Sequence, residues 1–152
     1  MIIYIEDVLR EANILNWYKG ESLKRGDENA VIVQSAKEEQ DAQLYFLRSA
    51  VTDLLMFANA NRVKFTCEYK DDALSFSLSP LREGREYLLD VLKEAIRQYL
   101  VYEVRRLWMM EVSPNNADSS LRESLRINIR EAMNNVTAMG EKVRRRCAIM
   151  GI

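Results

Sequence analysis

The feature that most constrains the fold is a change of hydrophobic period at residues 62–78. Before and after this stretch the apolar residues recur every three to four positions, whereas within it they alternate with polar residues. The apolar members of this alternation are Val63, Phe65, Cys67, Tyr69, Leu74, Phe76 and Leu78. A period of two is typical of strands with one buried face, and the polar Lys70-Asp71-Asp72 between the two runs predicts a β-hairpin. Because an isolated hairpin is marginal in water, we expect its apolar face to pack on helices.

Four other stretches have the apolar spacing of amphipathic helices, and they predict helices over about residues 4–17, 36–60, 85–111 and from about 118 onward. Ser35 and Glu38 have the spacing of a capping box at the start of the second helix, and Asp118 or Ser119 can cap the last one. A single seam follows the last helix, through Leu121, Leu125, Ile129, Ala132, Val136, Met139 and Val143. The short break at Pro114 predicts that the third and fourth helices are antiparallel.

The fold class that follows is α+β and mostly α: four helices with one β-hairpin inserted between helices two and three. A chain of 152 residues is the size of one domain. Within this single domain, residues 1–30 are an acidic first helix plus a polar loop, and residues 31–152 are a helical core with the hairpin at 62–78. Val31-Ile32-Val33 is either a brief strand or an apolar anchor ahead of the second helix.

The second and third helices carry so many apolar residues that we expect a wide buried face on each. In the second helix Tyr45 and Met56 widen the stripe, and in the third helix Val91 does so. Asp53 is the exception, because it interrupts the apolar run Val51–Phe57. It either faces outward or has a role of its own.

The residues that most enzymes use are scarce in this chain. It has no histidine, the commonest general base and metal ligand. Its five glycines form no phosphate-binding loop, and no lysine has the spacing that would activate a serine. Cys67 and Cys147 are too few and too far apart for a zinc site or a disulfide framework, and they predict two reduced thiols. We therefore expect no enzymatic activity, no cofactor and no metal.

Three pairs of neighbouring acids are candidates for acid–base chemistry: Glu6 with Asp7, Glu38 with Glu39, and Asp71 with Asp72. All three lie in polar or turn-like contexts, whereas catalytic carboxylates need a pocket that separates their pKa values. We interpret them as solvated. The acidic start also differs from a signal peptide, and no apolar run is long enough to span a membrane, so we expect a cytoplasmic protein.

Charge is distributed unevenly along the chain. Residues 1–41 carry a net charge of -4 and residues 121–152 a net charge of +4. The basic end includes Lys142, Arg144, Arg145 and Arg146. These cations either lie on a solvated helix end, contact a polyanion, or contact an acidic surface of a protein partner. The third reading includes copies that meet head to tail in a ring. Together with Trp17 and Tyr18, these four residues are the candidate interface.

The order of helices and aromatic residues resembles a known class of proteins. Residues 35–42 lead into a helix rich in tyrosine and phenylalanine, the hairpin follows, and then come residues 92–102 with Leu107-Trp108 behind them. Pro114 breaks the chain before a last helix that ends in Arg144-Arg145-Arg146. This order resembles small uncharacterised proteins of phage and prophage structural gene clusters, including head–tail connector and tail-completion proteins. The resemblance covers about residues 35–147 and implies no catalytic or ligand residue.

These observations favour a non-enzymatic assembly subunit of a phage-like particle, in the neck, head–tail connector or tail-completion region. Such a subunit would act by protein–protein contacts, including contacts with copies of itself, would not bind nucleic acid or membranes, and would be incorporated into a virion. The alternative is a cytosolic helical adaptor or regulatory module that binds one protein partner.

Overall fold

The computed structural model describes residues 1–13, 40–59 and 63–137. The described chain begins with strand β1 (Ile2–Tyr4) and a helix that starts at residue 5, of which residues 5–13 are described. It continues with helix α2 (Gln40–Asn59), strands β2 (Lys64–Lys70) and β3 (Ala73–Ser79), helix α3 (Leu89–Val112) and helix α4 (Arg122–Val136). Short 3-10 helices, Glu86–Leu88 and Pro114–Asn116, precede and follow α3. The predicted fold class is confirmed: a mostly helical α+β fold with the hairpin between α2 and α3.

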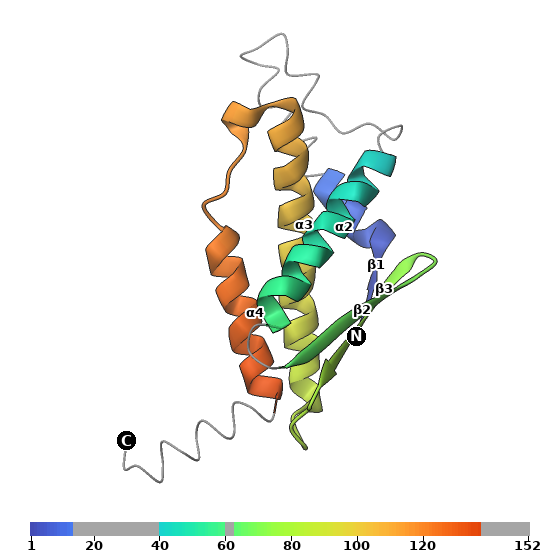
Figure 1. The fold of residues 1–152 in the computed structure, drawn as a ribbon, viewed down its shortest axis with the longest axis vertical. Helices are drawn as coiled ribbons and strands as arrows, with labels where there is room; N and C mark the ends of the chain where they lie inside the picture. Colours follow the sequence, from blue (N-terminus) through green and yellow to red (C-terminus); the bar gives the residue numbers. More distant parts are fainter. Residues whose placement is uncertain (14–39, 60–62, 138–152) are drawn as a thin grey trace.

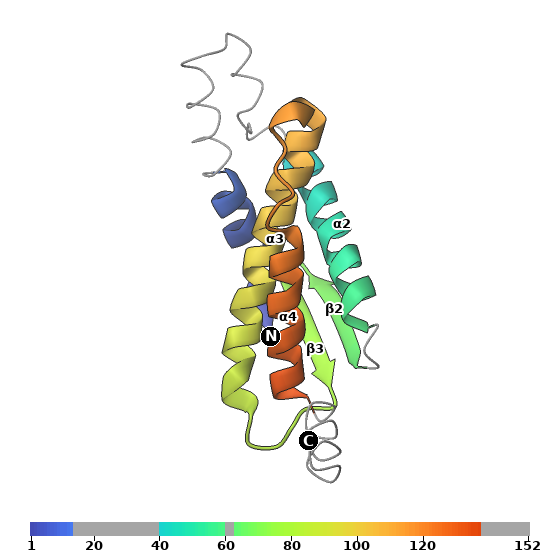
Figure 2. The same cartoon turned by 90° about the vertical axis from the view of Figure 1, so that its left-hand side faces the viewer.

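Helix α3 lies at the centre of the fold, with the long helices α2 and α4 beside it (Figures 1 and 2). Helix α4 runs antiparallel beside it, as the short connection predicts, and α2 packs on another side of α3. The sheet lies beside α2 and the first half of α3, so the apolar face of the hairpin is covered as expected. Its buried side chains, among them Phe65, Leu74 and Phe76, join those of the helices in one core. Cys67 is partly buried at the edge of this core.

The sheet has one strand more than the hairpin that the sequence predicts. Three antiparallel strands have the order β1-β3-β2, and Ile3 pairs with Leu74. The chain terminus extends this pairing, since the Met1 amino group donates to the Phe76 carbonyl at 2.8 Å and the Phe76 amide donates back to the Met1 carbonyl at 2.7 Å. The prediction of a helix from about residue 4 agrees with the observed start at residue 5 to within one residue, but strand β1 before it was not predicted. Residues 2–4 gain backbone hydrogen bonds to β3 that a helix end would lack.

The start of α4 also differs from the prediction. No side chain caps this helix at its first residue. The Asp118 carboxylate instead accepts a hydrogen bond from the Ser120 amide at 2.9 Å, which makes a turn ahead of the helix. The capping box of Ser35 and Glu38 lies outside the described residues, and so does Val31–Val33.

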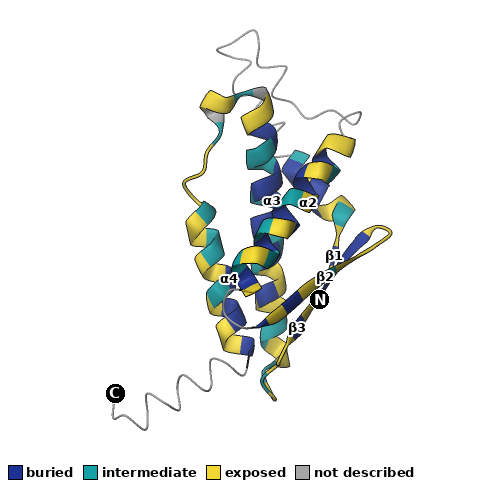
Figure 3. Ribbon diagram, in the orientation of Figure 1, coloured by how far each residue is buried: buried dark blue, intermediate teal, exposed yellow. Residues whose placement is uncertain are grey.

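Burial along the helices is narrower than the sequence predicts. In α4 the seam is buried from Ile129 to Val136, but Leu121 at its start is exposed. Tyr45 and Met56 of α2 are 68% and 73% exposed, and Val91 of α3 is exposed as well. Figure 3 shows exposed positions along α2 between buried ones. The expectation of wide buried faces is thus wrong at these positions, because no described segment covers them.

Candidate functional site

Four charged side chains and one tyrosine from three helices meet where α2, α3 and α4 approach one another. Asp53 lies in α2, Tyr99 and Glu103 lie in α3, and Arg122 and Arg126 lie in α4. Within α3 and within α4 the two residues are four positions apart, which places them on one face of the helix, one turn from each other. The two faces point toward Asp53 and toward each other, so the five side chains form one cluster.

Asp53 is the acceptor at one end of this cluster. The Tyr99 hydroxyl donates to its carboxylate, and Arg126 Nη2 donates to both of its oxygens at 2.9 and 2.7 Å. Arg122 Nη2 lies 3.3 Å from the same carboxylate. The Asp53 side chain is only partly exposed, so these partners hold the three helices together through a half-buried charge.

Glu103 is the acceptor at the other end. Its side chain is 1% exposed, and its carboxylate accepts hydrogen bonds from Nε and Nη2 of Arg106, each at 2.9 Å. The Arg122 Nε donates to it at 3.0 Å, so Arg122 joins Glu103 to Asp53. A buried carboxylate of this kind is stable only when its charge is compensated, and here two arginines compensate it.

The ionisation of the cluster follows from these contacts. Burial by itself would raise the pKa of Asp53, but the hydrogen bonds from Tyr99 and Arg126 and the charges of Arg126 and Arg122 outweigh it and hold that pKa below its usual value. Burial, followed by the hydrogen bond to Asp53, raises the pKa of Tyr99. Asp53 therefore stays ionised and Tyr99 stays neutral near pH 7.

An aromatic layer covers the cluster on one side. The guanidinium carbons of Arg126 and Arg130 lie 5.1 and 5.4 Å from the centre of the Phe57 ring, which is within cation–π range. The Phe57 ring meets the Tyr99 ring edge-on at 5.5 Å between centroids. These contacts fix the arginine side chains that the acids bind.

The chemistry of the cluster is that of a structural joint between helices. A carboxylate whose pKa is lowered is a weak base, and a tyrosine whose pKa is raised is a weak acid, so neither is tuned for proton transfer at neutral pH. Across the described residues, no group of three or more histidine, cysteine, aspartate or glutamate side chains could hold a metal ion.

The second feature is the solvent-facing side of α2 next to the cluster. Tyr45, Ser49, Thr52 and Met56 follow one another at helical spacing, and with Arg48 and Asp53 they line a shallow hollow of about 540 Å³. Two large side chains on this α2 stripe are mostly exposed, which is unusual for residues that gain by burial. Asp53 is the one carboxylate among the described residues that line the hollow.

The structure does not test the interface residues predicted from the sequence. Lys142, Arg144, Arg145, Arg146, Trp17 and Tyr18 all lie outside the described residues. Among the acid pairs, Glu6 with Asp7 and Asp71 with Asp72 are exposed, in agreement with the solvated interpretation. Asp7 is bonded to Arg10 at 2.7 Å. Glu38 and Glu39 lie outside the described residues, as does Cys147.

Asp53 stood out in the sequence, whereas its partners did not. Tyr99 and Glu103 are part of an apolar run in α3. Within that run the tyrosine is inconspicuous, and only the acid Glu103 stands out as a polar residue at a buried position. Arg122, Arg126 and Arg130 are spaced four residues apart, so they form a stripe beside the apolar seam of α4. An acid in one apolar run and a row of arginines along another helix together indicate a buried ion cluster.

Comparisons with protein-family models, with curated proteins and with solved structures find no match to this chain. Within the part of the chain that the structure describes, no helix is both long enough and apolar enough to cross a bilayer.

Proposed function

We propose that this chain is a non-enzymatic assembly subunit of a phage-like particle that acts through protein–protein contacts. Two kinds of support stand behind the proposal. The resemblance of residues 35–147 to small phage and prophage structural proteins suggests the particle, and the neck, head–tail connector or tail-completion region within it. The exposed stripe on α2 suggests contact as the mode of action.

The observation that carries the contact part is the exposure of Tyr45 and Met56 on the α2 stripe. Aromatic residues and methionine are enriched at the centres of protein interfaces, where they fill pockets of the partner. Arg48 lines the same hollow and offers a donor at its edge, beside the hydroxyl groups of Ser49 and Thr52. An apolar anchor with a polar rim is the usual layout of such an interface.

The charged cluster is consistent with the same function, because it holds in place the helix that carries the stripe. Asp53 is bonded to Arg126 and Tyr99 below the hollow, so α2 cannot rotate without breaking these bonds. A binding face that is already rigid loses less entropy when a partner docks. The cluster would thus position the stripe.

The genes that flank the coding sequence test the particle part. Neighbouring genes for portal, capsid or tail proteins are the expected result. A metabolic operon would contradict the proposal, as would a pull-down that recovers one host protein and no virion component, which is the result expected of an adaptor.

A pair of variants tests the contact part. Tyr45→Ser combined with Met56→Ser removes both apolar anchors from a solvent-facing surface, so the chain stays folded. We expect fewer complete particles when this variant replaces the natural chain. Ile127→Ser removes an exposed apolar side chain from α4 and is the matched control. Equal particle yields from the two variants would contradict the role of the stripe.

A further inference from the structure

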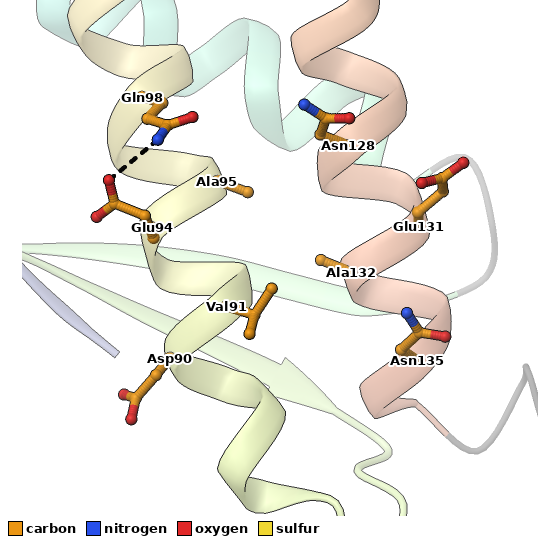
Figure 4. Close-up of a pocket in the computed structure, with 9 residues that line it drawn as sticks. All are labelled: Asp90, Val91, Glu94, Ala95, Gln98, Asn128, Glu131, Ala132 and Asn135. Atoms are coloured by element: carbon orange, nitrogen blue, oxygen red, sulfur yellow. Dashed lines mark hydrogen bonds between the residues drawn. The ribbon is translucent and has the colours of Figure 1, made fainter.

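A groove between α3 and α4 belongs to neither the cluster nor the α2 stripe. It encloses about 610 Å³ and lies on the side of α4 turned away from Arg126. Val91 and Ala95 of α3 and Ala132 of α4 point into the space between the helices (Figure 4). Val91 is 58% exposed although it is β-branched and apolar. The floor of the groove is therefore apolar and open to solvent.

The rim of the groove is acidic. Asp90 and Glu94 of α3 and Glu131 of α4 line it, together with the amides of Gln98, Asn128 and Asn135, and no base is among the lining residues of the described chain. In Figure 4 the carboxylates of Asp90 and Glu94 lie on the outer side of α3 and that of Glu131 on the outer side of α4, so the acids flank the apolar floor. Glu94 is bonded to Arg97 at 2.7 Å and to Gln98 at 3.1 Å. Among the described residues no ion pair joins Asp90 or Glu131 to a base. These two acids are the ones available to a partner.

We infer that the groove binds the basic C-terminal segment, residues 138–152, of a second copy of this chain. The segment has four bases, Lys142, Arg144, Arg145 and Arg146, against the single acid Glu141. It also has apolar residues, Val143, Ile149, Met150 and Ile152, that suit the apolar floor. Its charge and hydropathy thus complement both parts of the groove. This inference rests on the proposed function in one respect, namely that the chain works through protein contacts.

The direction of the chain after α4 favours binding of the segment to the groove of a second copy over binding to the groove of its own chain. Thr137 is buried and pairs antiparallel with Leu81, and the Arg82 amide donates to the Val136 carbonyl at 2.8 Å. This pairing leads the chain toward Pro80 and the end of β3 instead of back along α4. The last described residues therefore run beside Leu81 and not along the groove. Repeated head-to-tail contacts between copies form rings or open chains.

A charge swap in the full-length chain tests the inference. The self-association constant is measured by sedimentation over a concentration series at low and high salt. We expect Asp90→Lys with Glu131→Lys to raise the dissociation constant at least about tenfold, because two attractions become two repulsions. Arg144→Glu with Arg145→Glu should do the same. The combined variant should return to within about threefold of the natural chain, which also shows that the substituted chains are folded.

Asp72→Lys with Glu111→Lys is the matched control, since it reverses two exposed acids outside the groove. It should leave the dissociation constant unchanged. The inference is overturned if the natural chain stays monomeric throughout the series, if the groove variant associates like the control, or if the combined variant does not recover.

A photo-crosslinker in place of Val91 separates a second copy from the chain's own segment. The protein is mixed from light and heavy isotope forms before irradiation, and the linked peptides are sequenced. Links from residue 91 to residues 138–152 of the other isotope form are expected, whereas links only within one form would overturn the inference. Failure of these tests leaves particle yield and gene neighbourhood unaffected, so it is distinguishable from failure of the proposed function.

Discussion

The buried carboxylate of Glu103 provides the sharpest test of how the three helices are held together. Replacing Glu103 with alanine removes the acceptor of Arg106 and of Arg122. The Arg106 side chain is only 10% exposed, so most of its charge would be left buried without its partner. Breaking a buried pair on one side costs about 3–5 kcal/mol. Arg122 is more exposed and also lies near Asp53, so it can find a new partner. We therefore expect a loss of about 3 kcal/mol in the free energy of unfolding.

The assay is urea unfolding followed by circular dichroism, with the slope of the transition used to check that the folded state stays compact. Glu123→Ala is the matched control, because Glu123 is also paired with an arginine, Arg130 at 3.3 Å, but is exposed. Its loss should be below about 0.5 kcal/mol. Replacing Glu103 and Arg106 together by leucine should recover much of the stability, since both charges of this buried pair are then removed. A Glu103→Ala loss no larger than that of Glu123→Ala would refute the reasoning.

Three further predictions concern acid stability, packing and thiol reactivity. The pKa of Asp53 is lower in the folded state, so the ionised Asp53 side chain stabilises the fold above its unfolded pKa, and this stabilisation is lost as the pH falls through the folded pKa. Below about pH 4, the urea midpoint should therefore drop less for Asp53→Asn than for the natural chain. Leu54→Ala, at a fully buried position, should cost about 2–5 kcal/mol in thermal or urea unfolding, whereas Met56→Ala should stay within about 0.5 kcal/mol; equal losses would show that the burial pattern is wrong. Burial and the neighbouring carboxylate of Glu68 raise the pKa of the Cys67 thiol to about 11, so in a Cys147→Ser chain its alkylation at pH 8 should be slower in the folded than in the unfolded protein, and equal rates would contradict this.

The helices and the hairpin could be predicted because their signals are local. The alternation at residues 63–78 and the three-to-four spacing around it each depend on neighbours a few positions away. Strand β1 could not be predicted in this way, because three residues carry no period. Its existence depends on β3, which is about seventy residues further along the chain.

The charged cluster shows the same limit for side chains. Asp53 is conspicuous as an acid in an apolar run, but its donors Tyr99 and Arg126 are 46 and 73 residues away. Only the packing of three helices brings them together. The reverse applies to Tyr45 and Met56, whose residue types predict burial although the described fold leaves them in solvent. Sequence pattern specifies which face a residue occupies, and the tertiary arrangement decides whether that face is covered.

The central proposal is that this chain works as one component of a larger protein assembly. The direct measurement is the number of copies of the chain in purified phage-like particles from the organism that encodes it, determined by quantitative mass spectrometry against a tail or portal protein of known copy number. The account predicts a fixed number per particle that matches the rotational symmetry of its neighbours. Absence of the chain from complete particles would contradict it.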